Sequence, residues 1–263
     1  MIVVDNLHKH FGGVHAVDGA SLTIETGSIT GLIGPNGAGK TTLFNIIAGL
    51  FPPTSGTIHL DGEDITGLQP HELFGKGLLR TFQIAHEFST LTVLENLMMV
   101  PPDQLGERLV NTWFRRGAVA EEDRQIRDKA LEVIDFLNLG HLTEERAGNL
   151  SGGQKKLLEL GRTMMVDAKV VLLDEVGAGV NRTLLAQIGD AILKLNEERG
   201  YTFCMIEHDM DFIARLCDPV IVMAEGSVLA QGTAAEVRAN EDVIEAYLGT
   251  GLKNKTPKEK ASA

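Results

Sequence analysis

The sequence contains little cysteine, no long apolar run and a deficit of positive charge. Its two cysteines, Cys204 and Cys217, form no CxxC or Cys/His spacing, so neither a disulfide framework nor a thiolate metal site is expected, and reduced thiols fit the cytosol. The apolar stretches are only several residues long, whereas a membrane-spanning helix needs about 20. Residues 1–6 lack a basic-then-apolar leader. We therefore expect any membrane role to come through a partner.

The charge balance argues against a nucleic-acid partner. The 263 residues carry 24 Lys and Arg against 36 Asp and Glu, a formal net charge of −12, and binding to a nucleic-acid backbone needs clustered positive charge. The length of 263 residues is enough for one large core and an inserted lobe, and the hydrophobic content of 43% indicates a globular chain. Residues 253–263 hold four lysines, one glutamate and almost no apolar side chain, which predicts a disordered, solvated end.

A phosphate-binding loop is predicted at residues 34–41, which match G-x-x-x-x-G-K-[ST] directly after the apolar run Ile29–Ile33. Its glycines let successive backbone N–H groups point at an anion, and the following helix adds the positive end of its dipole. Lys40 would reach the β- and γ-phosphates of a nucleotide, and the Thr41 hydroxyl would supply one oxygen to Mg²⁺. A glycine-rich turn that binds nothing is the alternative. The predicted nucleotide-binding residues here are Gly34, Pro35, Asn36, Gly37, Ala38, Gly39, Lys40, Thr41 and Thr42.

A pair of carboxylates, Asp174 and Glu175, follows the continuous apolar run 170–173. A run of this kind predicts a strand buried on both faces, and ligands bind at the carboxyl edge of such a sheet. Asp174 would hold Mg²⁺ through water, and Glu175 would orient and deprotonate the attacking water. The alternative is a solvated loop that begins with two acids.

A third motif, Leu150-Ser151-Gly152-Gly153-Gln154, lies between these two. The chain thus contains a phosphate loop, this segment and a carboxylate pair, in this order. In this order of motifs it resembles the ATP-binding subunit of an ABC transporter, and the resemblance runs from about residue 2 to 249. The resemblance implies an α/β fold of the P-loop NTPase ABC-ATPase type, with a RecA-like core, an antiparallel β subdomain and an inserted α-helical subdomain. It implies one ATPase domain over residues 1–252, with the helical subdomain at about 84–160.

The same resemblance implies roles for three isolated residues. Phe11 matches the aromatic side chain that stacks on adenine, Gln83 the glutamine that touches Mg²⁺ or the lytic water, and His208 the histidine that contacts the γ-phosphate. Taken singly, Phe11 also fits a core residue, Gln83 a polar loop residue and His208 a helix start. The predicted catalytic residues are Glu175, His208 and Gln83, and the predicted metal ligands are Thr41, Gln83 and Asp174.

The Ser151 segment would begin a helix over 154–166, and a helix N-terminus is an anion site. Because the chain already has a phosphate loop, a second such site is redundant unless it serves another molecule's nucleotide. The resemblance implies that two cassettes pack head to tail, each ATP lying between one chain's loop at 34–41 and the other chain's Ser151, Gly152, Gly153 and Gln154. A serine-capped helix without a ligand is the alternative.

The remaining pattern is coarse. Runs at 2–4, 21–24 and 56–60 predict an antiparallel subdomain. Helices are predicted after Lys40, Asn181 and His208, so strand and helix alternate as in a parallel α/β sheet, and helical spacing at 91–99 and 124–137 predicts a helical lobe. Core strands are predicted at 29–33, 78–82, 170–173, 202–206 and 220–223.

Further segments are similar to the larger ATPase subunit of branched-chain amino acid uptake systems, among them Arg80-Thr81-Phe82-Gln83 and Ile206-Glu207-His208-Asp209. This likeness implies partners: a second ATPase subunit, transmembrane permease subunits and, indirectly, a periplasmic solute-binding protein. It implies a location on the cytoplasmic face of the inner membrane, and cargo that is a branched-chain amino acid or a related, amino-acid-like solute such as urea or an amide. A single-cassette exporter of lipid-linked material and a soluble, non-transport ATPase are the alternatives.

Two departures and one cluster stand apart from the family pattern. Val176 stands where many relatives have proline, which leaves the stiffness of the loop after Glu175 open, and Asn181 stands where many have aspartate. His8, His10 and His15 lie close in sequence, but no acidic or thiol ligand is spaced to complete a metal shell. A metal site at these histidines is therefore not expected.

Overall fold

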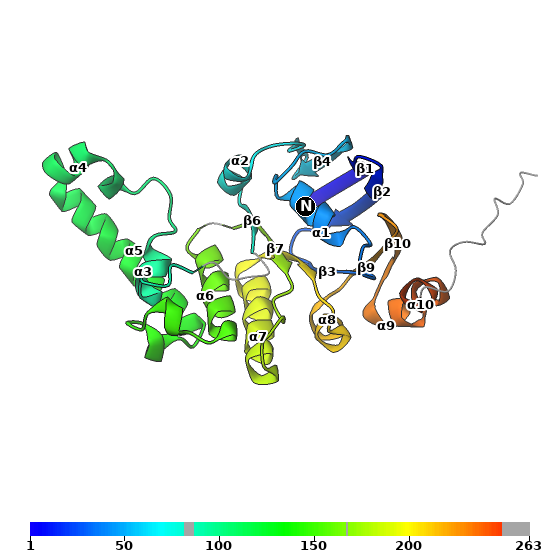
Figure 1. Ribbon diagram of the computed structural model, residues 1–263. Helices are drawn as coiled ribbons and strands as arrows, with labels where there is room; N and C mark the ends of the chain where they lie inside the picture. The colour runs from blue at the N-terminus through cyan, green and yellow to red at the C-terminus, as the bar shows by residue number, and fades with distance from the viewer. Residues whose placement is uncertain (82–86, 167, 249–263) are drawn as a thin grey trace, which may run out of the picture.

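The computed structural model describes residues 1–81, 87–166 and 168–248. A six-stranded sheet forms the centre of the molecule, with the strand order β10-β9-β3-β8-β7-β6 (Figure 1). All neighbours in it are parallel except β10, which runs antiparallel to β9. Its strands are β3 (Ile29–Ile33), β6 (Leu78–Arg80), β7 (Val170–Asp174), β8 (Thr202–Ile206), β9 (Val220–Ala224) and β10 (Ser227–Gly232). The predicted core strands at 29–33, 170–173, 202–206 and 220–223 are thus confirmed. The strand predicted at 78–82 is present over Leu78–Arg80, and residue 82 lies outside the described residues.

The central strands bury both faces, because their side chains alternate between two cores. On β7, Val171 and Leu173 join one hydrophobic cluster, whereas Val170 and Leu172 join the other. Every residue of β7 and β8 is buried, which is the pattern of a parallel sheet covered on both sides.

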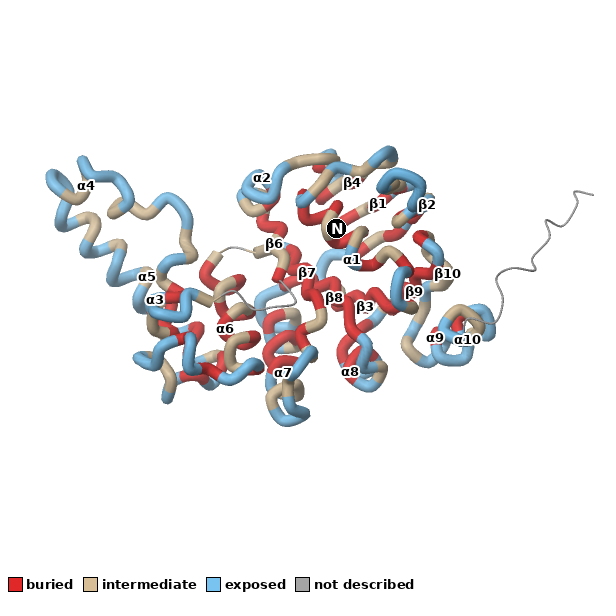
Figure 2. Tube along the Cα trace, in the orientation of Figure 1, coloured by how far each residue is buried: buried red, intermediate tan, exposed pale blue. Residues whose placement is uncertain are grey.

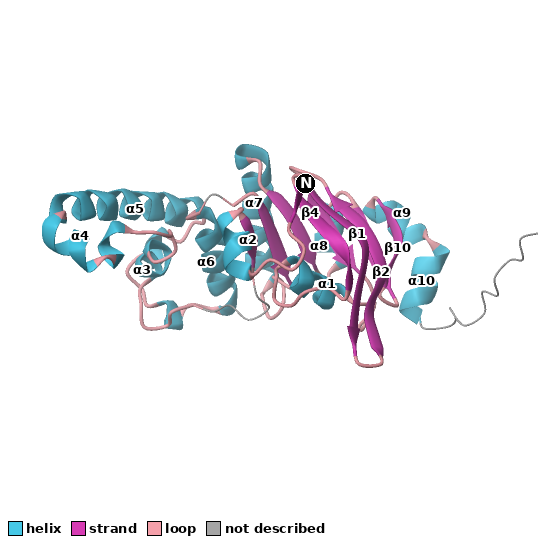
Figure 3. Cartoon of the chain, turned by 90° about the horizontal axis from the view of Figure 1, so that it is seen from above, coloured by secondary structure: helices cyan, strands magenta, loops and turns pink. Residues whose placement is uncertain are grey.

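A second sheet, antiparallel and four-stranded, has the order β2-β1-β4-β5. Its strands are β1 (Ile2–Phe11), β2 (Val14–Ile24), β4 (Ser55–Leu60) and β5 (Glu63–Asp64). Helix α1 (Lys40–Ile47) lies between the two sheets, because Leu43 and Phe44 share one buried cluster with Ile2 of β1 and Leu172 of β7. The predicted antiparallel subdomain is confirmed, and Figure 3 shows its strands beside the larger sheet.

Helices form the other half of the molecule. The lobe drawn at the left of Figure 1 contains α3 (Val93–Met98), α4 (Leu109–Phe114), α5 (Arg116–Phe136) and α6 (Gly152–Met164), joined by short 3-10 turns at Leu105–Glu107, Gly140–Leu142 and Ala147–Asn149. Helix α5 begins earlier than the predicted 124. The apolar period is weak over 116–123, yet Ala, Glu and Arg are good helix formers. Helix α6 begins earlier than the predicted 154, because Ser151 is its N-cap.

Other helices cover the sheet, and Figure 2 shows the red buried strands enclosed by them. They are α2 (Pro70–Gly75), α7 (Arg182–Arg199), α8 (Met210–Leu216), α9 (Ala234–Ala239) and α10 (Glu241–Leu248). No described helix combines the length and the apolarity that crossing a bilayer requires. The predicted disordered end at 253–263 lies outside the described residues.

The hairpin β9–β10 and helices α9 and α10 were not predicted. The sequence contains a signal for the hairpin, because Glu225 and Gly226 separate two apolar runs. In the structure both residues adopt positive φ, 49° and 82°. Two successive residues of this kind form the tight turn that suits the twist of paired strands.

Candidate functional site

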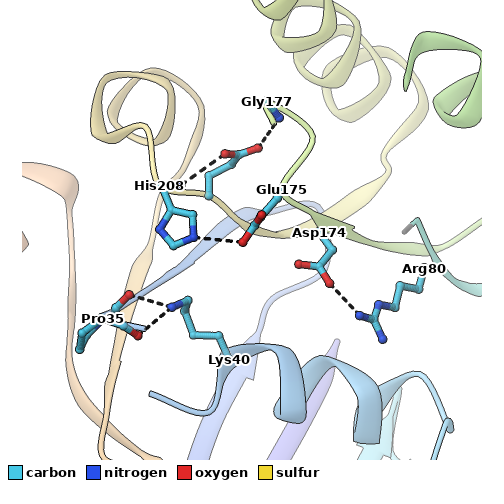
Figure 4. Close-up of polar contacts among 9 residues, drawn as sticks. Pro35, Lys40, Arg80, Asp174, Glu175, Gly177 and His208 are labelled. Atoms are coloured by element: carbon cyan, nitrogen blue, oxygen red, sulfur yellow. Dashed lines mark hydrogen bonds and ion pairs between the residues drawn. The ribbon is translucent and has the colours of Figure 1, made fainter. Parts of the chain in front are cut away.

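The predicted site residues meet where three neighbouring parallel strands end. The phosphate loop follows β3, Asp174 and Glu175 stand at the end of β7, and His208 follows β8 between them. The strands are level, since Leu32 and Asp174 both pair with Ile206. Figure 4 shows Lys40, Asp174, Glu175 and His208 around one space.

The phosphate loop depends on glycine at two positions. Gly34 has φ of 148° and Gly39 has φ of 97°, in the region where L-residues with a Cβ are strained. A Cβ at Gly34 would collide with the carbonyl oxygen of Met223, and one at Gly39 with that of Ala16. The β9–β10 turn supports the loop as well, because the Gly226 N–H donates to the Ala38 carbonyl at 3.2 Å.

Lys40 is buried, with 6% of its surface exposed. Its Nζ donates to the carbonyl oxygens of Gly34 at 2.7 Å and Pro35 at 3.0 Å (Figure 4). Burial lowers the pKa of this ammonium, and the nearby Glu175 and Asp174 carboxylates oppose that shift. A desolvated cation inside a loop of backbone amides suits an incoming polyanion.

Asp174 forms a buried ion pair with Arg80 of β6, at 2.7 Å between Oδ2 and the Arg80 Nη2. Their side chains are 7% and 8% exposed. Arg80 also donates to the side-chain oxygen of Asn45 on α1. The predicted metal ligand therefore holds a positively charged partner that sequence reasoning did not identify.

Glu175 stands directly after β7 in a left-handed backbone conformation, with φ of 49°. Such a conformation is uncommon for a residue with a Cβ. Its N–H donates to the Ile206 carbonyl at 2.9 Å, and its Oε1 lies 3.0 Å from His208 Nε2. His208 side chain is 51% exposed and that of Glu175 is 23% exposed, so the pair faces a space that solvent or a ligand can enter.

Glu207 is a second residue that sequence reasoning missed. It is 5% exposed and accepts from the N–H groups of Gly177 at 2.7 Å and His208 at 3.3 Å. Burial raises the pKa of its carboxyl, the two backbone hydrogen bonds lower it, the Glu175 charge raises it and His208 lowers it, with the net shift upward. Glu207 ties the loop after Glu175 to the start of the His208 loop, and Val176 is itself buried.

The segment 151–154 forms a helix cap. Ser151 Oγ accepts from the Gln154 N–H at 3.4 Å, and the Gln154 Oε1 accepts from the Ser151 N–H at 2.9 Å. A Cβ at Gly153 would collide with Leu184. Among the described residues, no hydrogen bond joins this cap to the phosphate loop.

Phe11 ends β1 beside the hairpin turn and is 49% exposed. Its ring packs edge-on against Phe51, with centroids 5.5 Å apart, and Lys9 Nζ lies 5.2 Å from the Phe11 centroid. Phe11 is therefore not a core residue, and its ring has exposed surface on which a nucleotide base could stack. Gln83, the third residue predicted from the resemblance, lies outside the described residues.

The histidine cluster requires a correction. Asp18 of β2 pairs with His8 across the sheet, so an acidic ligand is present although the sequence spacing did not reveal it. His8, His10 and Asp18 offer ligand atoms within 4.8 Å of one another. His8 is already engaged, however, by Asp18 at 2.9 Å and by Asn6 Oδ1 at 3.2 Å. Tetrahedral zinc ligands lie about 3.4 Å apart, closer than the limit of 4.8 Å that these atoms meet. His8, Asp18 and Asn6 form a hydrogen-bonded chain, whereas the Nε2 atom of His10 is buried without a hydrogen-bond partner among the described residues.

The chain belongs to the ABC transporter family, whose model matches residues 17–178. A second model, described as a branched-chain amino acid ATP-binding cassette transporter, matches residues 227–253. The sheet with its phosphate loop, carboxylate pair and histidine thus defines an ATP-binding cassette.

Individual relatives agree. The chain is 41% identical to the probable branched-chain amino acid transport ATP-binding protein LivG of Archaeoglobus fulgidus, over 95% of each chain. It is 38% identical to the high-affinity branched-chain amino acid transport ATP-binding protein BraF of Pseudomonas aeruginosa, over 95% of this chain and 98% of that one. These relatives confirm the resemblance drawn from the motifs.

Solved structures confirm the fold. A nucleotide-free ATP-binding cassette from an ABC transporter aligns with a TM-score of 0.80 and 36% identity, covering 94% of this chain and 98% of that chain. The ADP conformation of an ATP-binding cassette of an ABC transporter aligns with the same score and identity over 95% and 98%. The predicted P-loop NTPase ABC-ATPase fold is therefore correct.

The Arg80–Asp174 pair leads to a stability prediction. Arg80→Met leaves a buried carboxylate without its cation and should lower the free energy of unfolding by about 3 kcal/mol, measured by urea denaturation without nucleotide or Mg²⁺. Arg80→Met with Asp174→Asn should recover most of this loss. Lys76→Met, which removes the exposed Lys76–Glu63 pair, should cost less than about 1 kcal/mol. A single Arg80→Met variant as stable as the double variant would contradict the coupling.

The raised pKa of Glu207 leads to a pH prediction. The folded state holds this proton at pH values where the unfolded carboxyl, with its ordinary pKa of 4.5, has lost it. The free energy of unfolding should therefore fall as pH rises from about 4.5 through the raised pKa, by at most about 1.4 kcal/mol per pH unit. Glu207→Gln, whose amide oxygen still accepts from Gly177, should flatten this slope. The exposed Glu132→Gln is the control, and an unchanged slope in Glu207→Gln would disprove the assignment.

Proposed function

We propose that this chain is the ATP-hydrolysing subunit of an ABC importer for branched-chain amino acids or a related solute such as urea or an amide. The observation that carries the proposal is the meeting of Lys40, Asp174, Glu175 and His208 at three neighbouring strand ends. The relatives are named for branched-chain amino acid transport, which favours these solutes over lipid-linked material and over a soluble, non-transport role.

The nucleotide would be held by the backbone amides of the phosphate loop and by Lys40. A triphosphate can replace the carbonyl oxygens of Gly34 and Pro35 as partners of the Lys40 ammonium, and the gain is large because this cation is desolvated. Thr41 and Thr42 lie in the first turn of α1, where the helix dipole favours an anion. Phe11 would stack on adenine with its exposed ring face.

The Thr41 hydroxyl, the Asp174 carboxylate and Gln83 are the side chains predicted to hold Mg²⁺. Mg²⁺ prefers oxygen ligands such as hydroxyl and carboxylate groups. In the structure the Asp174 carboxylate forms an ion pair with the Arg80 guanidinium. Bound Mg²⁺ would neutralise charge on the β- and γ-phosphates. Arg80 would compensate the Asp174 charge whenever Mg²⁺ is absent.

Glu175 would accept the proton of the water that attacks the γ-phosphorus, while the bond to the β–γ bridging oxygen breaks and ADP leaves with that oxygen. His208 Nε2 holds the Glu175 carboxylate by a 3.0 Å contact, so the base has a defined position. The γ-phosphate could then become a second partner of His208.

A second cassette would complete each nucleotide site with Ser151, Gly152, Gly153 and Gln154. In support, the cap at Ser151 places N–H groups at the start of α6 and makes no hydrogen bond to its own phosphate loop among the described residues. A bacterial ABC transporter cassette at 25% identity and a TM-score of 0.71 has a dimeric structure. We propose the same head-to-tail pairing here.

Permease subunits would dock in a cleft between the helical lobe and the sheet. This cleft encloses about 540 Å³, and Leu50 and Phe88 on its walls are 47% and 45% exposed. Arg80 lines it as well, so the cleft and the Asp174 site share one side chain.

Because permease subunits are proposed as partners, we place the subunit on the cytoplasmic face of the inner membrane, with a periplasmic solute-binding protein as an indirect partner and no nucleic acid. We assign residues 1–252 to the ATPase domain and about 84–160 to its helical subdomain.

The proposed role of Glu175 is tested by Glu175→Gln. This change removes the base and keeps the side-chain shape, so phosphate release should fall by about 10²- to 10⁴-fold. ATP affinity by calorimetry should be retained, and ATP should trap a dimer visible by light scattering. Exposed Glu197→Gln on α7 is the control with the same change. Normal turnover in Glu175→Gln would remove Glu175 from this role.

The proposed docking cleft is tested by Phe88→Asp. A carboxylate in place of the ring should reduce co-purification with the permease subunits at least about tenfold, which corresponds to about 1.4 kcal/mol, because a docked subunit would cover a charged side chain instead of an apolar one. Basal ATPase activity of the isolated chain should stay within about twofold, which corresponds to less than 0.5 kcal/mol. Leu248→Asp, at an exposed apolar position on α10, is the matched control. Full co-purification of Phe88→Asp would place the permease contact elsewhere.

A further inference from the structure

Helix α4 carries its apolar side outward. Leu109, Val110, Trp113 and Phe114 are 81%, 69%, 77% and 81% exposed. Large apolar side chains scattered singly on a surface need no explanation, but four within six residues form a patch. Figure 2 shows α4 in pale blue at the far end of the helical lobe.

The arrangement is an inverted amphipathic helix. Residues 109 and 113, and likewise 110 and 114, are four apart, so the four side chains lie on one face. Asn111 and Thr112 lie on the opposite face and are partly buried. Asn111 Nδ2 donates to the Leu105 carbonyl at 3.1 Å. A helix of a globular protein normally turns its apolar face to the core, and this one turns its polar face inward.

Specific contacts hold α4 in this orientation. The Leu105 N–H donates to the Glu122 carboxylate of α5 at 2.6 Å, and Gln104 donates to the Met98 and Pro101 carbonyls at 2.9 and 3.1 Å. The turn before α4 is therefore tied to α5 on one side and to the end of α3 on the other. The apolar face is presented by a braced element.

The residues that directly flank α4 are basic, although the chain as a whole carries −12. Arg108 precedes the helix and Arg115 and Arg116 follow it, and all three are exposed. Between residues 104 and 117 the only acid is Glu107. An exposed apolar face with tryptophan, bracketed by arginines, has the composition of a helix that lies in the interface of an anionic membrane.

Charge also decides against two other occupants. Cytoplasmic loops of membrane proteins carry an excess of Lys and Arg, so a permease loop would repel the three arginines. A second copy seated on the same face by two-fold symmetry would bring like arginines together. Anionic phospholipid headgroups match both the arginines and the apolar face.

We propose that α4 is a lipid anchor, whose Leu109, Val110, Trp113 and Phe114 enter the headgroup region of an anionic bilayer while Arg108, Arg115 and Arg116 contact phosphate groups. The anchor rests on the proposed function only in that the subunit works beside a membrane. It would orient the helical lobe toward the bilayer independently of the permease cleft.

Trp113 is the only tryptophan of the chain and reports directly on this contact. The full-length protein is mixed with vesicles of phosphatidylcholine containing phosphatidylglycerol, and separately with phosphatidylcholine alone. With anionic vesicles the Trp113 emission should shift to the blue, acrylamide should quench it less, and the protein should pellet with the vesicles. Raised salt should weaken pelleting, because the arginine contribution is screened.

Variants separate the two parts of the anchor. Leu109→Glu with Phe114→Glu should abolish pelleting, whereas Ile244→Glu with Leu248→Glu, at exposed apolar positions of α10, should retain it. Changing Arg108, Arg115 and Arg116 to glutamine should lower vesicle affinity by about 100-fold, since each arginine near the surface contributes roughly a fivefold factor. Circular dichroism of all variants should match that of the unaltered protein, because the changed side chains are exposed. ATPase activity of the variants at and beside α4 should match as well, because α4 lies at the far end of the helical lobe (Figure 1).

Several results would overturn the anchor. The anchor would be wrong if the protein did not pellet with anionic vesicles, or if pelleting survived Leu109→Glu with Phe114→Glu. A blue shift of the Trp113 emission without lipid, together with a doubled mass of the protein, would show that a second copy covers α4. Protection of Trp113 only after permease subunits are added would show that the permease covers it. Vesicle binding and ATP turnover are measured separately. An inactive ATPase that still binds vesicles would count against the proposed function alone, and an active ATPase that ignores vesicles would count against the anchor alone.

Discussion

The parallel pairing of β3 and β7 to the two edges of β8 is the constraint on which the site depends. Parallel strands end at the same edge of a sheet, so the loops after these three strands must lie side by side. The register makes them level, because Leu32 and Asp174 pair with the same residue, Ile206. Reversing any of the three strands would carry its functional residue to the opposite edge. Burial of both faces of these strands stabilises that register, since a one-residue slip would exchange the two cores.

Charges at this edge are paired within the protein. Lys40 donates to loop carbonyls, Asp174 pairs with Arg80, and Glu175 contacts His208. A buried unpaired charge is costly, so these internal partners make the nucleotide-free site compatible with a stable fold. In the proposed function, ligand binding is an exchange of partners. Arg80 connects this exchange with the proposed permease cleft, because its side chain pairs with Asp174 and also lines that cleft.

Sequence prediction succeeded where one residue pattern determines local structure. The continuous apolar runs at Ile29–Ile33 and Thr202–Ile206 became strands with those bounds, because such runs are stable only when buried on both faces. Prediction failed for Ser227–Gly232, a partly buried strand with weak alternation. The outward-facing apolar residues of α4 follow helical spacing, and that spacing by itself indicates an inward apolar face. The start of α5 was missed for a related reason, since its first turns bury little.

The sequence by itself determined the family, the phosphate loop, the carboxylate pair and the strands that position them, because each rests on residues close together in the chain. Only the tertiary structure decided the partners of these residues: Arg80 for Asp174, Glu207 for the loop after Glu175, and Asp18 for His8. Those contacts join residues on different strands or loops, and their distances follow from strand order and register. The outward orientation of α4 was likewise decided in space, by hydrogen bonds from residues 104, 105 and 111.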